Sequence, residues 1–199
     1  ELHRRLVAIS SDIVATAPIP DRLAEIGWTG GEAVSDSQQM VHYYSCTRDG
    51  RIVFGKGGWG IAMAGRIPGS FDRHERRAAD VTADFQRIYP ALSDVEITHD
   101  WSGPIDRSAN GVPLLGRLGG REHLLYGVGW SGNGVGPSWL GGRILGSLAL
   151  GLRDQWSQCG LVDNERAGVL PPEPIRYLGD HIVRTAVVRK ERLHRRGEE

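Results

Sequence analysis

The sequence predicts an α+β fold: a mostly antiparallel or mixed β-sheet with flanking helices. β-Prone runs come first, an amphipathic helix follows, and further strands and helices come after it. Strands and helices therefore do not alternate as a regular βαβ series. The composition is typical of a globular protein, with 40% apolar residues. Glycine is the exception, because its 28 residues among 199 are about twice the average usage.

Composition also excludes several classes of function. Lys+Arg and Asp+Glu both number 24, so net charge predicts binding to neither nucleic acid nor an anionic membrane surface. No apolar run reaches the roughly 18 residues of a membrane-spanning helix. The two cysteines and scattered histidines lack metal-ligand spacing, which predicts no metal site and a reduced, cytoplasmic setting.

The first third of the chain predicts strands. Residues 6–17 are rich in β-branched side chains and end at two prolines, and residues 20–26 form one helical turn. Two β-prone runs, 39–46 and 51–54, flank an Asp-Gly pair, which predicts a β-hairpin. The glycine-rich residues 55–60 that follow are expected to form a flexible loop.

Residues 72–88 give the clearest helix signal. Asp72 and Glu75 have the spacing of a capping box. One face of this helix is apolar, at Ala78, Val81, Phe85 and Ile88. The other face is charged and is expected to be solvated, at Arg73, Arg76, Arg77, Asp80 and Asp84.

The second half alternates strand and helix signals. Residues 95–101 predict a strand, which a turn-rich stretch follows, and residues 124–129 predict a short buried strand. Residues 139–152 predict a helix with apolar side chains at Leu140, Ile144, Leu145, Leu148 and Leu152. After a proline-rich linker, residues 175–193 predict a last helix with an apolar stripe at Ile182, Val183, Ala186 and Val187.

A glycine-rich loop, residues 126–138, lies between the predicted buried strand and the apolar helix. A helix N-terminus carries unpaired N–H groups and partial positive charge, and glycines leave room for a ligand to approach them. The pattern therefore predicts a ligand-binding loop. A tight turn needed only for packing is the alternative that the pattern leaves open.

Four motifs in fixed order identify a family resemblance, in residues 43–55, 101–107, 111–116 and 127–134. Together they resemble the C-terminal portion of FAD-dependent amine and amino-acid oxidoreductases of the D-amino-acid-oxidase (DAO) superfamily. The similarity is strongest to gamma-glutamylputrescine oxidoreductase-like members, with glycine and sarcosine oxidases further off. It covers roughly residues 10–190.

The resemblance implies the organisation of the chain. Residues 6–120, with helix 72–88, would form a substrate-binding β-sheet domain. Residues 121–155 would be the returning C-terminal segment of the FAD-binding domain, a strand–glycine loop–helix remnant of a Rossmann-like fold. Residues 170–195 would form a C-terminal helix.

One expected motif is absent. The family's Gly-x-Gly-x-x-Gly fingerprint does not occur after a strand, and residues 55–60 lack a βαβ context. Because the chain also begins with Glu1, we expect a partial chain whose partner is a separate upstream FAD-domain polypeptide. The alternative is a non-catalytic remnant or interaction domain that does not bind flavin by itself.

The family implies oxidation of an amine C–N bond to an imine, with flavin as hydride acceptor. No catalytic side chain is assigned, because an amine can react in its neutral form. By resemblance, flavin would lie against the loop residues Gly129, Trp130, Ser131, Gly132, Asn133, Gly134 and Val135. For Ser131 and Asn133, local turn hydrogen bonding is the alternative role.

The substrate prediction depends on Ile105. Amino-acid-oxidising relatives carry Trp-x-Gly-Leu-Arg-Pro, and Ile105 stands at the arginine position that would bind a substrate carboxylate. We therefore predict a small-molecule amine substrate. Asp106 would pair with a distal ammonium, or it caps a turn. Tyr43 and Trp130 would line an aromatic site, whereas Tyr44 points to the opposite face of its strand from Tyr43.

Overall fold

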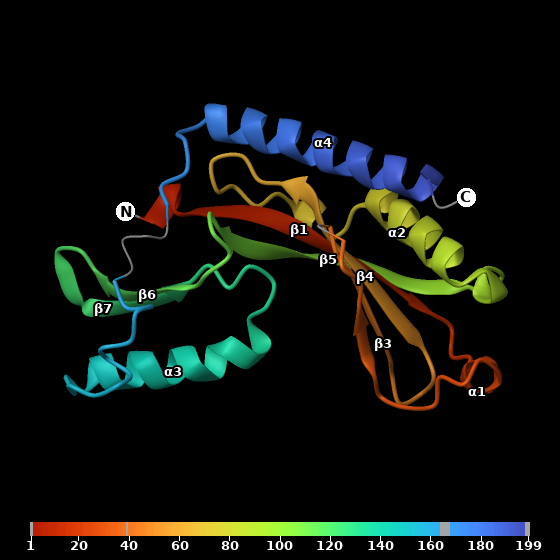
Figure 1. Ribbon diagram of the computed structural model, residues 1–199, viewed down its shortest axis with the longest axis horizontal. Helices are drawn as coiled ribbons and strands as arrows, with labels where there is room; N and C mark the ends of the chain where they lie inside the picture. The colour runs from red at the N-terminus through yellow and green to blue at the C-terminus, as the bar shows by residue number, and fades with distance from the viewer. Residues whose placement is uncertain (1, 39, 164–167, 198–199) are drawn as a thin grey trace. The chain divides into compact units, whose positions relative to one another are not determined.

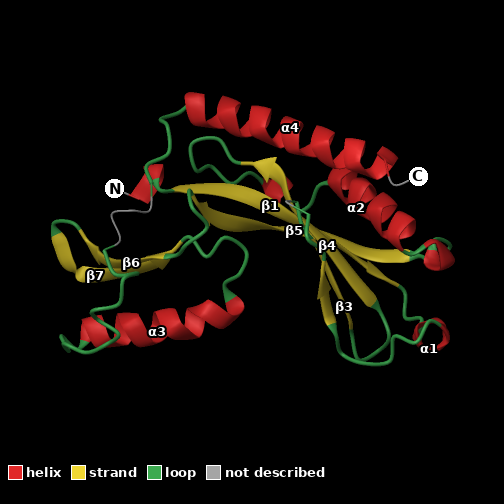
Figure 2. Cartoon of the chain, in the orientation of Figure 1, coloured by secondary structure: helices red, strands yellow, loops and turns green. Residues whose placement is uncertain are grey.

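The computed structural model describes residues 2–38, 40–163 and 168–197, and its elements follow the predicted α+β class (Figures 1 and 2). The chain forms two compact units. Unit 1 comprises Glu1–Ile9, Ala62–Arg66 and Ile105–Gly179, and unit 2 comprises Ser10–Ile61, Ile67–Pro104 and Asp180–Glu199. The predicted domain 6–120 is thus divided between both units, while segment 121–155 lies within unit 1. The assignment of residues 6–120 to substrate binding and of residues 121–155 to FAD binding stays a prediction.

A five-stranded sheet has the strand order β2-β3-β4-β1-β5. Its strands are β1 (Leu6–Thr16), β2 (Ala33–Ser35), β3 (His42–Cys46), β4 (Ile52–Ile61) and β5 (Ile97–Ser108). The predicted first strand and the predicted hairpin are both confirmed. β3 and β4 pair antiparallel with Cys46 opposite Ile52. Gly50 takes φ +79° in the turn, the left-handed conformation that glycine adopts at little cost.

The flexible loop predicted at residues 55–60 is wrong, because these residues continue strand β4. Gly55 pairs with Tyr43 on β3, and a Cβ at Gly55 would overlap the Tyr43 ring. The glycine therefore serves close approach of an aromatic ring inside the sheet.

The turn-rich stretch predicted after Trp101 is also wrong, because β5 continues to Ser108. β5 contains Pro104, which cannot donate a backbone hydrogen bond. The strand order places β5 at an edge of the sheet. An edge strand tolerates proline because one side of its backbone has no strand partner.

Unit 2 contains helices α1 (Pro20–Glu25) and α2 (Glu75–Ile88). Short 3₁₀ turns lie at Leu2–Arg4, Gly69–Phe71 and Pro90–Leu92. The predicted capping box at Asp72 is wrong. The N-cap of α2 is His74, whose side chain accepts a hydrogen bond from the Arg77 amide at 3.4 Å. The Asp72 carbonyl instead accepts one from the Ser102 amide at 2.7 Å.

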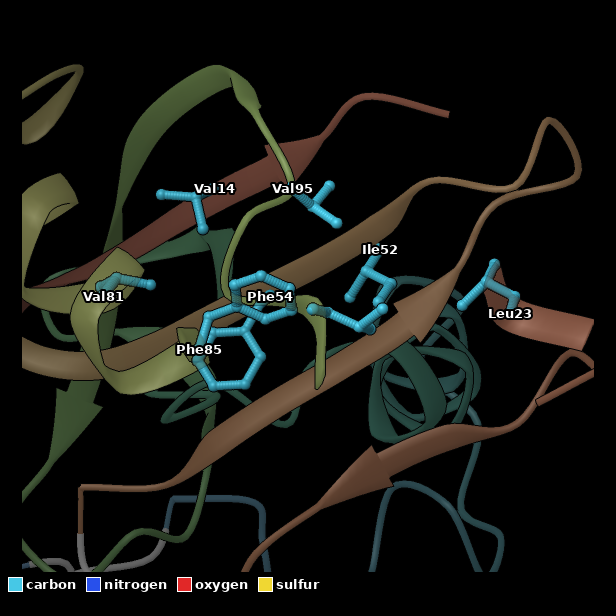
Figure 3. Close-up of a cluster of buried hydrophobic side chains, with 8 residues drawn as sticks. Val14, Leu23, Ile52, Phe54, Val81, Phe85 and Val95 are labelled. Carbon is cyan, nitrogen blue, oxygen red and sulfur yellow. The ribbon is translucent and has the colours of Figure 1, made fainter. Parts of the chain in front are cut away.

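The predicted apolar face of α2 forms the core of unit 2. Val81 and Phe85 are fully buried, and the cluster drawn in Figure 3 joins them to Val14, Ile52 and Phe54. The Phe54 and Phe85 rings meet edge to face, with centroids 5.7 Å apart. Packing of α2 on the sheet therefore rests on the face that the sequence periodicity selects.

Two residues of the predicted solvated face of α2 are buried instead. Arg77 donates from Nε to Asp12 Oδ1 at 2.8 Å, and Asp12 on β1 is itself buried. Asp84 accepts from Lys56 Nζ on β4 at 2.7 Å. Each charge can be buried because its partner comes from the sheet, which the spacing along the helix alone does not reveal.

Asp84 also receives hydrogen bonds from other groups. His42 Nε2 lies 3.0 Å from Asp84 Oδ2, and His42 Nδ1 lies 2.6 Å from Asp36 Oδ2. Arg87 Nη2 donates to Asp84 Oδ1 at 3.0 Å. Burial opposes ionisation of Asp84, but the hydrogen bonds from His42, Lys56 and Arg87 outweigh it and lower the pKa of this carboxyl. His42 is thus a structural histidine.

Unit 1 contains a two-stranded antiparallel sheet, β6 (Leu114–Leu118) and β7 (Arg121–Val128), and helix α3 (Val135–Ala149). The prediction of a short buried strand at 124–129 is corrected, since β7 starts earlier and Leu124 is exposed. β6 was not predicted, because Gly116 interrupts its apolar pattern. Helix α3 begins four residues before the predicted start, and its face packs through Ile144 and Leu148 on Leu115.

The last helix, α4 (Ile175–Gly197), confirms the helix predicted over 175–193. Its predicted apolar stripe is not a buried face, since Ile182 and Val183 are 70% and 60% exposed. Among the described residues, no helix is both long and apolar enough to cross a membrane.

Replacing Phe85 with alanine tests the core of unit 2. Because Phe85 is fully buried against Phe54, Phe85→Ala should lower the free energy of unfolding by about 3–5 kcal/mol. Urea denaturation measures this change. Arg76→Ala, at an exposed position on the same helix, is the matched control and should change stability by less than about 0.5 kcal/mol.

Replacing Asp84 with asparagine tests the buried charges. At pH 7 Asp84→Asn should cost about 3–5 kcal/mol, because buried Lys56 loses its carboxylate partner. A lowered pKa in the folded state contributes stability above the ordinary carboxyl pKa of about 3.9, and this contribution is lost as the pH falls below that value. The difference between variant and parent should therefore shrink towards pH 3, as denaturation at each pH would show. Asp72→Asn should be nearly neutral throughout, and an equal loss in both variants would contradict the assignment.

Candidate functional site

The glycine-rich loop of unit 1 joins the end of β7 to the start of α3. Gly129, Ser131 and Gly132 take φ values of +79°, +56° and +88°. Ser131 tolerates this left-handed conformation through its side chain, which donates to the Gly129 carbonyl at 3.1 Å and accepts from the Ser108 amide at 3.2 Å. The loop is therefore held in one shape by hydrogen bonds.

Asp106 fixes the start of this loop. Its Oδ2 accepts the Gly129 amide at 2.6 Å, and its Oδ1 accepts the Trp130 amide at 3.1 Å. The Asp106 carbonyl accepts the Ser131 amide at 3.1 Å. The carboxylate thus binds two successive amides, as in the turn-capping role. Pairing with a substrate ammonium stays a prediction.

The amides at the other end of the loop point to no acceptor. Within the described part of the chain, the N–H groups of Gly132, Gly134, Val135 and Gly136 donate no hydrogen bond. Gly134 is the N-cap of α3 and provides no capping side chain, and Val135 is 96% exposed. Open amides at the N-terminus of a 15-residue helix create a positive potential that favours an anionic or electron-rich ligand.

Other predicted loop residues have structural contacts. The Asn133 amide donates to the Trp130 carbonyl at 3.0 Å, which matches local turn bonding. The Trp130 indole packs with Leu115, and a Cβ at Gly141 would overlap it. The Trp130 side chain thus lies in the core of unit 1, and an aromatic role towards substrate stays a prediction. Ile105 lies beside the loop, with Cδ1 3.5 Å from where a Gly132 Cβ would stand.

Tyr43 belongs to unit 2, whereas the loop residues belong to unit 1. Its hydroxyl forms a hydrogen bond with Ser11, and burial raises its pKa. Tyr44 points to the other sheet face and stacks on Phe54 with centroids 5.1 Å apart, as strand alternation predicts. The structure therefore brings Ile105, Asp106 and the loop together in unit 1, whereas Tyr43 belongs to unit 2.

Two residues of the site were not predicted. Ser108, which is 1% exposed, supports Ser131 and donates to the Val112 carbonyl at 2.8 Å. The open amide of Gly136 was missed because the helix was expected to start later. Pro137 in the first turn was the available signal, since proline there marks a helix start. No group of acidic, histidine or cysteine side chains among the described residues could hold a metal ion.

Comparison with known proteins identifies the family to which the chain belongs. Residues 1–148 match the family model for FAD dependent oxidoreductase, named DAO. The chain belongs to the DAO family. The predicted resemblance is thereby confirmed, and the open-amide loop lies inside the matched DAO region.

Individual relatives agree with the DAO assignment. The chain is 28% identical over 150 residues to the probable oxidoreductase OrdL of Haemophilus influenzae, covering 75% of this chain and 31% of the relative. It is 26% identical over 151 residues to gamma-glutamylputrescine oxidoreductase of Escherichia coli, covering 76% and 33%. Glycine oxidase from Geobacillus kaustophilus shares the fold, with a TM-score of 0.57, 17% identity and coverage of 82% and 40%. The chain thus spans about a third of the length of these curated relatives.

The loop fits the cofactor that the DAO family implies. Open amides of Gly132, Gly134, Val135 and Gly136 form a donor set, and a Cβ added at Gly136 would meet no atom within 4 Å. A ligand can therefore approach the chain at Gly136 without hindrance from side chains, whereas Ile105 lies beside Gly132 and Trp130 beside Gly134. Such donors suit the electron-rich edge of a flavin ring or a phosphate oxygen.

Replacing Asp106 with asparagine tests the loop anchor. An amide has one acceptor oxygen instead of two, so Asp106→Asn leaves one loop N–H facing an NH₂ group. We expect about 1–3 kcal/mol of destabilisation and faster hydrogen exchange at Gly129 and Trp130. Exchange followed by NMR measures the second effect. Glu122→Gln, an exposed carboxylate-to-amide change in the same unit, should alter neither, and unchanged exchange in Asp106→Asn would contradict the anchor.

Proposed function

We propose that this chain is the C-terminal part of an FAD-dependent oxidoreductase that oxidises an amine C–N bond to an imine. The observation that carries the proposal is the open-amide loop, held by Asp106, within the region that matches the DAO family. When bound, the flavin supplies the chemistry by accepting a hydride from the carbon that bears the amine. The imine then reacts with water, and oxygen or another acceptor takes the electrons.

The residues of this chain would hold and polarise the cofactor. The amides of Gly132, Gly134, Val135 and Gly136 would donate to an electron-rich edge of FAD, and the α3 dipole reinforces their positive potential. Such donors stabilise negative charge better when they are fixed before the reaction. Asp106 and Ser131 provide that fixation, so they act as positioning residues. No side chain is proposed as a base.

The proposed substrate is an amine without a carboxylate beside the reacting carbon. Ile105, which occupies the arginine position of the amino-acid-oxidising pattern, lies beside Gly132 and has no charge with which to bind such a carboxylate. The E. coli relative is named for gamma-glutamylputrescine, an amine, and we extend only the amine class to this chain.

A separate FAD-domain polypeptide is the proposed partner. The chain covers 31% and 33% of its relatives and contains no dinucleotide fingerprint. That partner would supply the surface for the ADP part of FAD. Both cysteines are free thiols, which supports a reduced, cytoplasmic location.

Titration with FAD tests the proposal. The purified chain, alone and co-expressed with an upstream FAD-domain polypeptide, should quench flavin fluorescence on binding and become yellow. Gly136→Val adds a side chain at one of the open amides and should weaken FAD binding about tenfold. Gly142→Val, a similarly unobstructed glycine further along α3, is the matched control and should bind FAD as the parent does.

The outcomes separate the two candidate functions. A protein that stays colourless both alone and with the partner would overturn the proposal in favour of the non-catalytic remnant or interaction domain. Equal weakening by both valine variants would show that the open amides do not hold the flavin.

A further inference from the structure

Unit 1 contains a cavity of about 460 Å³ whose lining includes none of the open amides of the proposed flavin site. This volume is within the roughly 300–1,000 Å³ of small-molecule sites. Most of its wall is apolar, from Leu2, Leu6, Ala8, Ala64, Pro171 and Pro172. An apolar wall favours a ligand portion that gains by leaving water.

One wall comes from residues beyond the DAO-matched part of the chain, which ends at residue 148. Its main-chain and side-chain contacts hold this wall in place. The Leu170 amide donates to the Arg4 carbonyl at 2.7 Å, and Arg176 Nη1 donates to the His3 carbonyl at 2.7 Å. Glu173 accepts from the Ala64 amide at 3.0 Å and from Arg176 Nε at 2.9 Å. Hydrogen bonds to other parts of unit 1 therefore fix the position of this wall.

The cationic side chain in this wall is already neutralised. Arg176 is 6% exposed, and its guanidinium donates to Glu173 and to the carbonyls of His3 and Leu6. It therefore has little capacity left to bind a ligand carboxylate. His3 and Arg4 also line the cavity, but both are exposed, and Arg4 Nε donates to the Leu170 carbonyl at 3.0 Å. An anionic ligand end would therefore find little compensation along the buried part of this wall.

Two residues connect the cavity to the glycine-rich loop. Asp106 lines the cavity and binds the Gly129 and Trp130 amides. Leu6 also lines it, and its Cδ2 is 3.1 Å from where a Gly129 Cβ would stand. Among the described residues, Asp106 forms no ion pair. The loop end of the cavity thus has a carboxylate whose negative potential favours a cation.

We propose that this cavity binds the substrate as an amine with an extended apolar substituent, its amino end towards Asp106 and its apolar end among Leu2, Ala8 and Pro172. The inference rests on the proposed function and narrows its substrate class, from amines in general to monoamines with a hydrocarbon tail. Asp106 binds the ammonium form, and the ammonium loses its proton to water before the neutral amine reacts. Residues 170–176 then determine specificity as the wall that the tail contacts.

Binding measured without flavin tests this inference. Hexylamine, putrescine and hexanoate are titrated into the chain while its amide resonances are followed by NMR. Hexylamine should shift the resonances of Ala64, Asp106 and Glu173 and should bind at least about tenfold more tightly than the other two. Putrescine would bury a second ammonium in an apolar wall, and hexanoate would bring a carboxylate to Asp106.

Two variants test the location. Ala8→Phe reduces the volume of the cavity and should weaken hexylamine binding about tenfold. Ala83→Phe, at an exposed position on α2, is the control and should leave hexylamine binding unchanged. Leu2→Ala enlarges the cavity, so it should change the preference from hexylamine towards octylamine. A change of preference with tail length cannot arise from misfolding alone.

The results that would overturn the inference are distinct from those that concern flavin. Absence of hexylamine binding, tighter binding of putrescine or hexanoate, or indifference to both Ala8→Phe and Leu2→Ala would each contradict it. Loss of FAD binding together with intact hexylamine selectivity would remove the proposed function and keep a binding site for apolar amines.

Discussion

The carboxylate of Asp106 is the interaction on which the site depends. It binds two successive amides of a loop whose backbone is left-handed at Gly129, Ser131 and Gly132. A carboxylate can satisfy both amides at once, so the first part of the loop needs no ligand to stay in shape. The amides of Gly132, Gly134, Val135 and Gly136 are thereby left to act as donors, so one segment of the chain is held in shape and still has N–H groups without an acceptor.

Unit 2 is held together in a different way, by buried ion pairs that join helix α2 to the sheet beside an apolar core. Phe85 and Val81 provide burial, while Asp84 with Lys56, and Arg77 with Asp12, provide fixed partners between α2 and the strands. Apolar packing alone tolerates sliding of a helix over a sheet. Paired buried charges do not tolerate it, because any shift would leave a charge without its partner.

Periodicity along the chain predicted most of the elements, including β1, the β3–β4 hairpin, α2, α3 and α4. The errors share one physical cause. Arg77 and Asp84 look solvated on a helical wheel because their partners on the sheet, Asp12 and Lys56, lie more than 25 residues away in sequence. Gly55 looks like a loop residue because Tyr43, which takes the place of its side chain, lies on another strand. Long-range pairing decided each case.

The candidate site shows the same limit. The loop at 126–138 and its glycine content were evident from sequence, and so was Ile105 in place of an arginine. Which amides stay open was not, because that depends on Asp106 reaching Gly129 across 23 residues of chain. The supporting role of Ser108 was equally hidden, since its contact with Ser131 also spans 23 residues.

The two edges of the five-stranded sheet carry a further consequence. β2 has only three residues, and β5 includes Pro104, which interrupts the row of donors that a foreign strand would need. A sheet with such edges offers a poor template for strand addition by another molecule. The five-stranded sheet therefore limits strand addition through a short strand at one edge and a proline at the other, and not through net charge, which is formally zero.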